Sequence, residues 1–358
     1  MKAIIPTGGR GTRMRPLTFS ANKHFIPVAN KPLIFYPIET VAEIGVKEIG
    51  ITYNPGGLEE AQRILGDGSR WGLKFTYILQ ERPAGLADII RVCEKFMNGE
   101  EFVFHLGDNI FVGGINEAVQ YFRRRKPNGL ITMVHHTENR RMGVPYFNKE
   151  GQLLRYVEKP ENPPHDFAVP GVYFADSSIF RCFKEDAIKP SSRGELEIPD
   201  AFQWMIDHHL LVDVVEYKGK WLDPGKFNDW IEANQYLLDS QLAPQLESEM
   251  GPGTILENRV KVGHDCQIEG SHIRGPVIIG NRVVVKNSYI GPYTSVSDDC
   301  LIEDAHVENS VIMEGVKVSK IRQPIDTSLI GAQSEIVNSD RPTSSLQFFI
   351  GEKCSIEI

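Results

Sequence analysis

The first 240 residues alternate between two patterns of hydrophobic and polar positions. Short runs rich in β-branched and aromatic residues occur at residues 2–6, 48–53, 74–79, 101–108 and 130–136. Amphipathic segments with helical spacing lie between them, for example at residues 32–45 and 85–97. Strands and helices in alternation predict an α/β domain with a mostly parallel sheet and helices on both faces. Ligands of such sheets bind at the carboxyl ends of the strands.

A different period begins after a helical segment that starts near residue 228. Single aliphatic residues recur at intervals of five or six, with glycine and polar residues between them. They are Val262, Ile268, Ile273, Ile279, Val285, Ile290, Val296, Ile302, Val307, Ile312 and Val318. A hexapeptide period is typical of a parallel β-helix, in which each short strand carries one inward aliphatic side chain. Eleven consecutive matches argue against the alternative of irregular hairpins. We expect three to four coils that end near Val318, then one further strand or packing arm at residues 346–358.

The change of period predicts two domains, residues 1–240 and 241–358, which agrees with a length of 358 residues. The fractions of hydrophobic residues (41%) and charged residues (24%) are those of a globular protein. A net charge of -8 argues against a nucleic-acid partner, because nucleic-acid-binding domains are basic. The same charge allows a small anion in a locally basic cleft.

Five scattered cysteines form no Cys-x-x-Cys pair, which argues against a zinc site or a disulfide framework and favours a reducing compartment. The amino terminus lacks a signal-peptide pattern, and no apolar run approaches the roughly 18 residues that a membrane span needs. We therefore expect a cytoplasmic protein with no membrane partner.

The segment after the first strand, residues 6–18, combines glycines with arginines. They are Gly8, Gly9, Gly11, Arg10, Arg13 and Arg15. Glycines let backbone N–H groups approach a ligand, and guanidinium groups suit phosphate oxygens. Met14 stands where a dinucleotide fingerprint needs its third glycine, and the Gly-Lys-Ser/Thr ending of a Walker A loop is missing. The segment predicts an anion site of another kind, with a glycine-rich surface turn as the alternative.

Three further residues are candidates for chemistry on the same anion. Lys23 lies between a turn and an apolar run, although a lone lysine is usually a solvated charge. Asp108 follows a buried-looking strand, and Asp223 lies in the segment WLDPG. Carboxylates at strand ends can hold Mg²⁺, but they can also cap a helix or form a turn. Two carboxylates and a cation-rich loop together suggest metal-assisted phosphoryl or nucleotidyl transfer.

Several motifs, in order along the chain, carry a resemblance to a known family. They are PTGGRGTRMRPLT, NKHFIPVANKP, QERPAGLA, HLGDN, VEKP, RGELEIPDA and WLDPG. The chain resembles the sugar-nucleotidyltransferase family over essentially its whole length, in the long form that ends in a hexapeptide domain. The resemblance implies a Rossmann-like nucleotidyltransferase domain followed by a left-handed parallel β-helix. It also implies a Mg²⁺-dependent in-line displacement, in which glucose 1-phosphate attacks the α-phosphorus of dTTP to give dTDP-glucose and pyrophosphate.

The resemblance also implies residue roles. The nucleotide would be bound by Gly8, Gly9, Gly11, Thr12, Arg13, Gln80, Gly85 and Asp108. Catalysis would depend on Arg13, Lys23, Asp108 and Asp223, the two aspartates being the metal ligands. The sugar phosphate would be bound by Gly143, Glu158, Lys159, Val169 and Tyr173. One glutamate of GELE would join them, and the sequence leaves open whether it is Glu195 or Glu197.

Two other functions are compatible with parts of the sequence. A UTP-using uridylyltransferase with a second acetyltransferase activity would also carry a hexapeptide domain. Its relatives usually have Gly-Thr-Ala where this chain has Gly85-Leu86-Ala87, and a short β-helix leaves little room for an acyltransferase site. A non-enzymatic scaffold would be expected to lose a metal carboxylate or a loop cation, and none is lost here. We therefore expect an enzyme with dTTP and glucose 1-phosphate as partners, in a homo-oligomer.

Overall fold

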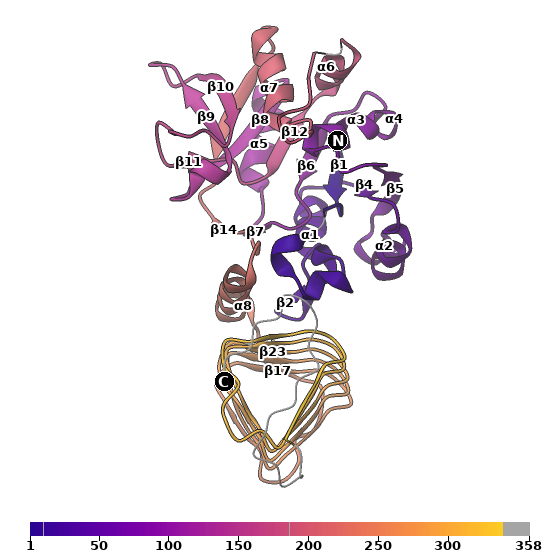
Figure 1. Cartoon of the computed structure of the whole chain (residues 1–358), viewed down its shortest axis with the longest axis vertical. Coiled ribbons are helices and arrows are strands. Elements are labelled where there is room, and N and C mark those ends of the chain that lie inside the picture. The colour runs from indigo at the N-terminus through magenta and orange to yellow at the C-terminus, as the bar shows by residue number, and fades with distance from the viewer. Residues whose placement is uncertain (10, 186, 339–358) are drawn as a thin grey trace. The chain divides into compact units, whose positions relative to one another are not determined.

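The computed structural model describes residues 1–9, 11–185 and 187–338. These residues belong to two compact units, whose elements Figure 1 labels. The first unit consists of Met1–Arg10 and Ile34–Leu222, and the second of Gly11–Leu33 and Asp223–Ile358. Each unit thus contains part of the opening of the chain. The predicted boundary near residue 240 concerns functional domains and stays a prediction.

The first unit is built on an eight-stranded mixed sheet. Its strands are β1 (Lys2–Pro6), β4 (Glu48–Tyr53), β5 (Lys74–Leu79), β6 (Phe102–His105), β8 (Gly129–His135), β11 (Phe167–Ala168), β12 (Val172–Ala175) and β13 (Val212–Glu216). The order is β11-β8-β12-β6-β1-β4-β5, with β13 beside β8. Strands β6, β1, β4 and β5 are parallel, as predicted, whereas β12 is antiparallel to both of its neighbours.

Helices and two small sheets complete this unit. The helices are α1 (Phe35–Glu43), α2 (Leu58–Leu65), α3 (Leu86–Val92), α4 (Glu94–Met97), α5 (Asn116–Arg125), α6 (Arg181–Lys184) and α7 (Ile198–Asp207). The small sheets pair β9 (Gly143–Phe147) with β10 (Leu153–Glu158), and β7 (Ile110–Val112) with β14 (Lys220–Leu222). The single helix expected at residues 85–97 is divided at Cys93, where φ is -85° and ψ is -3°.

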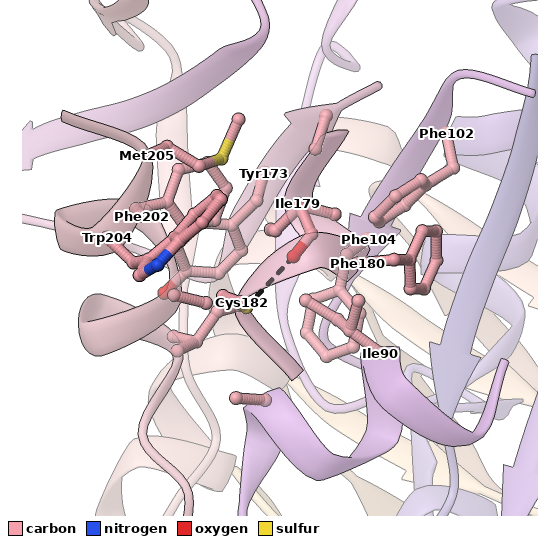
Figure 2. Packing of buried hydrophobic residues seen from close by; sticks show 14 of the residues in the cluster. Ile90, Phe102, Phe104, Tyr173, Ile179, Phe180, Cys182, Phe202, Trp204 and Met205 are labelled. Atoms are coloured by element: carbon pink, nitrogen blue, oxygen red, sulfur yellow. Dashed lines mark hydrogen bonds between the residues drawn. The ribbon is translucent and has the colours of Figure 1, made fainter. Parts of the chain in front are cut away.

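Aromatic side chains fill the core on one side of this sheet (Figure 2). Phe102 and Phe104 of β6 are at most 1% exposed, and the Phe102 ring lies 6.0 Å from that of Phe180. Tyr173 of β12 contacts Phe202 of α7 at a centroid distance of 5.5 Å. Burial of each such side chain contributes about 1.5–3 kcal/mol. The core therefore fixes β6, whose carboxyl end leads to Asp108.

The second unit contains a left-handed parallel β-helix with a triangular cross-section (Figure 1). One parallel sheet contains β15 (Gln245–Leu246), β17 (Val260–Val262), β20 (Val277–Ile279), β23 (Thr294–Val296), β26 (Val311–Ile312) and β28 (Leu329–Ile330). The second contains β16 (Ile255–Glu257), β19 (His272–Arg274), β22 (Tyr289–Ile290) and β25 (His306–Val307). The third contains β18 (Gln267–Glu269), β21 (Val284–Lys286), β24 (Leu301–Glu303), β27 (Lys317–Ser319) and β29 (Glu335–Val337). All eleven predicted aliphatic residues are at most 1% exposed, which confirms the period.

The β-helix continues beyond Val318, so the predicted end of the repeats is wrong. Ile325 forms a parallel bridge with Val307, and β28 and β29 extend two of the sheets. The step from Val318 to Ile325 is seven residues, one more than the period, and this longer turn hides the continuation in the sequence. With six strands in one sheet, the coil is also longer than the predicted three to four turns. The strand or arm predicted at residues 346–358 lies outside the described residues.

Helix α8 (Phe227–Gln241) joins the opening segment to the β-helix within the second unit. Asn234 is 1% exposed and accepts hydrogen bonds from Ala29 N (2.9 Å) and Ser295 Oγ (2.6 Å). Its Nδ2 donates to the carbonyl oxygen of Tyr293 (2.9 Å). Trp230 Nε1 donates to the carbonyl oxygen of Pro27. Pro27 is the first residue of the short hairpin formed by β2 (Pro27–Val28) and β3 (Lys31–Pro32). Residues 27–30 are therefore held by α8 and by the coil.

No helix among the described residues combines the length and the apolarity that crossing a membrane requires.

Candidate active site

The glycines that follow β1 lie beside Asn54, which comes directly after β4. The backbone N–H of Gly9 donates to Asn54 Oδ1 (3.2 Å). A Cβ atom on Gly8 would lie 2.6 Å from the same oxygen, so a larger residue would displace Asn54. Gly9 has a φ of 125°, which favours glycine. Glycine is thus required at residue 9 by its backbone conformation and at residue 8 by the close approach of the Asn54 side chain.

Gln80, predicted to contact the base, is 3% exposed and has several partners. Its Nε2 donates to the carbonyl oxygen of Gly85 (3.2 Å) and to Asp88 Oδ2 (2.9 Å). The other oxygen of Asp88 accepts from Arg91 Nε (2.8 Å) and Nη2 (2.6 Å). Gly85 has a φ of 101°, and a Cβ atom there would lie 2.3 Å from the carbonyl oxygen of Leu196. The structure therefore brings Gln80 and Gly85 together, as predicted.

Arg13, Arg15 and Lys23 belong to the second unit. Arg13 is exposed in a short helical turn (Thr12–Met14), after Gly11 with a φ of 52°. The guanidinium of Arg15 lies over the Phe19 ring at 4.7 Å. Lys23 is 8% exposed, and lysines are rarely so buried unless they are paired. The Lys23 side chain is therefore buried within the second unit and is not a solvated surface charge.

Within the same unit, Arg13 lies beside the glycine of the WLDPG motif. A Cβ atom on Gly225 would lie 3.4 Å from Arg13 Nη1. This contact joins the opening segment to the motif that carries Asp223, two residues earlier in the chain. The structure thus brings two of the predicted motifs together.

Asp108 is half-buried after β6 and is oriented by its neighbour. Asn109, which is 3% exposed, donates from Nδ2 to Asp108 Oδ1 (2.9 Å). Asn109 Oδ1 in turn accepts from Trp221 Nε1 (2.7 Å). Nearby, His105 Nδ1 is bonded to the carbonyl oxygen of Leu106 (2.8 Å), and burial lowers the pKa of His105 to about 4. His105 is therefore neutral at pH 7 and adds no positive charge beside Asp108.

The donor set suits Mg²⁺ better than zinc. The described ranges contain no cluster of three or more His, Cys, Asp or Glu residues suited to a metal. Mg²⁺ is usually held by one or two carboxylates and completes its shell with water and substrate phosphates. Asp108 lies two residues before β7, and Asp223 comes directly after β14.

The predicted sugar-binding residues come together where β9 pairs with β10. Gly143 lies opposite Glu158 in this pair, and its carbonyl oxygen accepts from Val169 N (2.9 Å). A Cβ atom on Gly143 would lie 2.5 Å from the Tyr156 hydroxyl, so a larger residue would displace that ring. The hydroxyls of Tyr156 and Tyr173 are 3.0 Å apart, and burial raises the pKa of both, which keeps both protonated.

A cavity of about 450 Å³ opens beside these residues. Its lining includes Glu158, Lys159, Arg193, Glu197 and Asp200. Arg193 Nη2 lies 2.7 Å from Glu197 Oε1 and 3.5 Å from Glu158 Oε1. Lys159 Nζ lies 2.9 Å from Glu158 Oε1. Cations and carboxylates thus alternate around this cavity.

The cavity distinguishes the two glutamates that the sequence left open. Glu197 is 8% exposed and lines the cavity, whereas the Glu195 side chain is 40% exposed and does not line it. Sequence reasoning missed Arg193 itself, although it begins the motif RGELEIPDA. It also missed Asn54 and Asp88, whose local sequence carries no distinctive signal. A second cavity, of about 790 Å³, is lined by Arg82, Asp88 and Arg91 among others and by none of the predicted site residues.

Comparison with known proteins shows the family. The nucleotidyl transferase family profile matches residues 2–240. A glucose-1-phosphate thymidylyltransferase of Streptomyces antibioticus is 36% identical over 359 aligned positions, covering 100% of this chain and 99% of its own length. A solved structure from Bacillus anthracis, described as a glucose-1-phosphate thymidylyltransferase in complex with sucrose, has a TM-score of 0.61 at 33% identity. It covers 65% of this chain and 94% of its own.

A UDP-glucose pyrophosphorylase solved with UDP-glucose has a TM-score of 0.58 at 25% identity, and the match covers 66% of this chain and 98% of its own. The family match thus includes the glycine-rich loop, the aspartate loop after β6 and the cavity beside β10. On the family profile and the full-length relative together, the chain belongs to the nucleotidyl transferase family.

Proposed function

We propose that this enzyme transfers a thymidylyl group from dTTP to glucose 1-phosphate, giving dTDP-glucose and pyrophosphate. The observation that carries the proposal is the full-length similarity to a relative named glucose-1-phosphate thymidylyltransferase. The geometry supports it, because a glycine-rich loop, a buried glutamine bonded to Gly85 and a polar cavity of about 450 Å³ occur in one chain. The cations Lys159 and Arg193 of this cavity suit a phosphate, and its carboxylates can accept hydrogen bonds from sugar hydroxyls.

The reaction is a single in-line displacement. A phosphate oxygen of glucose 1-phosphate forms a bond to the α-phosphorus of dTTP, and the bond from that phosphorus to the β-phosphate oxygen breaks. Both reactants and the leaving pyrophosphate are anions, so catalysis consists of positioning and charge neutralisation. Arg13 would bind the α- and β-phosphates, and Lys23 would assist.

Backbone groups would hold the rest of the nucleotide. Gly8, Gly9, Gly11 and Thr12 would wrap the phosphates and ribose. The amide of Gly9 donates to Asn54, so a nucleotide oxygen would have to share or replace this hydrogen bond. Gln80 and the backbone of Gly85 would contact the base edge.

Asp108 and Asp223 would hold Mg²⁺. The donor type supports this assignment, since Mg²⁺ is usually held by one or two carboxylates and completes its shell with water and substrate phosphates. When bound, the metal would neutralise negative charge on the phosphates. Asn109 and Trp221 would keep the Asp108 carboxylate in a fixed orientation.

The cavity beside β10 would bind the sugar phosphate. Of the residues predicted for the sugar phosphate, Glu158 and Lys159 line this cavity, and Glu197 is the glutamate of GELE that we add to them. Gly143, Val169 and Tyr173 are buried and do not line it, so they would act from behind the lining. Lys159 would pair with the phosphate, and we add Arg193 as a second cation there. Arg193 pairs with Glu197 and Glu158, so the phosphate would compete with these carboxylates for its guanidinium.

We assign catalysis to residues 1–240, which the family profile nearly spans, and assembly of a homo-oligomer to residues 241–358. A cytoplasmic location fits the four described cysteines, which are all buried free thiols. A UTP-using enzyme with acetyltransferase activity is the second candidate, favoured by the likeness to UDP-glucose pyrophosphorylase. The β-helix of this chain is longer than predicted, so its length no longer argues against an acyltransferase site. The preference for dTTP over UTP therefore depends on Leu86 in the base motif.

The test follows labelled phosphate with glucose 1-phosphate as acceptor. With α-³²P-dTTP we expect the label in the nucleotide sugar, and with γ-³²P-dTTP we expect it in pyrophosphate. Asp108→Asn and Asp223→Asn should each lower kcat by about 10²–10³, the usual effect of losing one electrostatic contact in the transition state. A γ-label in the sugar product, or no product from the wild type, would refute the proposed reaction. Full activity of one variant at saturating Mg²⁺ would remove that aspartate from the metal site.

A further inference from the structure

We propose that Asp88 is a specificity-determining residue, which locks the side-chain amide of Gln80 so that it can only accept a hydrogen bond from the base. The inference rests on the proposed function, in which Gln80 contacts the base. It adds the class of base selected: a pyrimidine whose N3 carries a hydrogen, as in thymine and uracil, and not cytosine. The observation behind it is a series of hydrogen bonds that runs from the Gly9 amide through Asn54, Gln80 and Asp88 to Arg91.

The nitrogen of the Gln80 amide has no hydrogen left for a ligand. An amide NH₂ group carries two hydrogens. One is donated to the carbonyl oxygen of Gly85 (3.2 Å) and the other to Asp88 Oδ2 (2.9 Å). Both acceptors are fixed, the first in the backbone and the second in a side chain that is 4% exposed. A base can therefore meet only the oxygen of this amide.

The Gln80 oxygen keeps one unused acceptor position. An amide oxygen has two lone pairs. One accepts from Asn54 Nδ2 (3.3 Å), which also donates to the Gln80 backbone oxygen (3.1 Å). Asn54 cannot turn round without penalty, because its Oδ1 accepts from Gly9 N (3.2 Å). The remaining lone pair is available to a donor on the base.

Asp88 is held in turn by a residue that can only donate. The guanidinium of Arg91 donates twice to Asp88 Oδ1, at 2.8 and 2.6 Å, which leaves Oδ2 facing Gln80. A carboxylate is an acceptor at both oxygens, so the Gln80 atom that it faces must be nitrogen. The reversed amide would place two acceptors against each other in a buried site, which is costly. Charge and burial thus decide the orientation.

The predicted selection follows from the edge of the base. Thymine and uracil present an N3–H donor, whereas the N3 of cytosine is an acceptor and would face the Gln80 oxygen without a proton between them. A site built to form a hydrogen bond discriminates strongly against a partner that lacks the matching group. The same arrangement does not separate thymine from uracil, since both carry N3–H.

The experiment measures kcat/KM for dTTP and for dCTP with glucose 1-phosphate, in the wild type and three variants. In Asp88→Asn, the guanidinium of Arg91 can only donate, so it bonds the side-chain oxygen of the asparagine. The NH₂ group of the asparagine then faces Gln80 and favours the reversed orientation of the Gln80 amide. We expect the dTTP:dCTP ratio to fall about tenfold or more, because each 1.4 kcal/mol of lost discrimination is tenfold. Arg91→Met alone leaves both carboxylate oxygens as acceptors, so the ratio should stay at the wild-type value.

The double variant Asp88→Asn/Arg91→Met provides the rescue. Without Arg91, the asparagine is free to turn its oxygen towards Gln80, and the ratio should return towards the wild-type value. A merely structural role would lower both rates together and leave the ratio unchanged, and that result in Asp88→Asn would overturn the inference. Failure of the rescue, with wild-type unfolding midpoints, would also overturn the orienting role of Arg91.

Equilibrium binding of dTTP and dCTP to the same four proteins separates this inference from the proposed reaction. If the wild type forms no nucleotide sugar but binds dTTP better than dCTP, the reaction is refuted and the binding ratios still test Asp88. If the wild type binds both nucleotides equally, the inference is refuted whatever the reaction.

Discussion

At the scale of single residues, the structure separates cations that the sequence could not rank. The opening segment contains three arginines, of which Arg10 lies outside the described residues. Arg15 lies over the Phe19 ring, so that part of its surface is used in packing. Arg13 is exposed and lies beside Gly225 of the motif that carries Asp223. Arg13 is therefore the stronger candidate for phosphate binding.

We predict that Arg13→Lys lowers kcat/KM for dTTP about tenfold or more. Lysine keeps the charge but loses the planar fork that binds two phosphate oxygens at once, and each 1.4 kcal/mol lost is tenfold. Arg15→Lys is the matched control and should have a milder effect, since its guanidinium contacts a ring. Steady-state kinetics at one fixed Mg²⁺ concentration decide between them. A silent Arg13→Lys beside a collapsed Arg15→Lys would reverse the assignment.

Short motifs carry the residues predicted for the site, and the structure places some of them side by side. Gln80 and Gly85 do lie together, as do Gly143 and Glu158, and their side chains or backbones are bonded as neighbours. The supporting residue Asn54 was missed, since its partner Gln80 is 26 residues away and only the sheet brings them together. A hydrogen-bond network between elements leaves no local pattern to read.

At the scale of elements, the periodicity of the sequence predicted the strands and coils that repeat one pattern. It failed where a helix is interrupted or a turn is longer than the period. The parallel strands and the inward aliphatics of the coil were predicted because each repeats one simple pattern. The helix at residues 85–97 was expected to be continuous, but it is divided at Cys93 into α3 and α4. The end of the coil was misplaced because one turn, between Val318 and Ile325, is longer than the others.

Helix α8 gives the prediction at this scale. Asn234→Leu would remove the partners of Ala29 N, Ser295 Oγ and the Tyr293 carbonyl at a site that is 1% exposed. Because each buried polar group left unsatisfied costs about 1–3 kcal/mol, we expect the free energy of unfolding in urea to fall by about 2 kcal/mol or more. The opening segment that carries Lys23 would also loosen, so the KM for dTTP should rise.

The control is the next residue along the helix. Gln235 donates to Asn309 Oδ1 in the coil (2.6 Å) and not to residues 27–30, so Gln235→Leu should lower stability without changing the KM for dTTP. Equal kinetic effects of Asn234→Leu and Gln235→Leu would show that α8 affects nucleotide binding only through general stability.

At the scale of the whole molecule, the two compact units do not follow the order of the chain. Residues 11–33, with Arg13 and Lys23, group with the β-helix, whereas Gly8, Gly9 and Asp108 belong to the first unit. No pattern in the sequence predicts this division, because it arises from hydrogen bonds such as that from Asn30 Nδ2 to the Val296 carbonyl oxygen (2.5 Å), 266 residues apart. The coil thus supports residues to which we assign catalysis.

The most direct measurement is pyrophosphate release from a matrix of nucleoside triphosphates and sugar 1-phosphates, with kcat/KM determined for each pair. The account predicts the highest value for dTTP with glucose 1-phosphate. UTP should follow closely, since a single methyl group in a pocket is worth only about 1–3 kcal/mol. dCTP should be poor, and ATP and GTP should be poor as well. A maximum at another nucleotide or another sugar phosphate, or no pyrophosphate from any pair, would contradict the account.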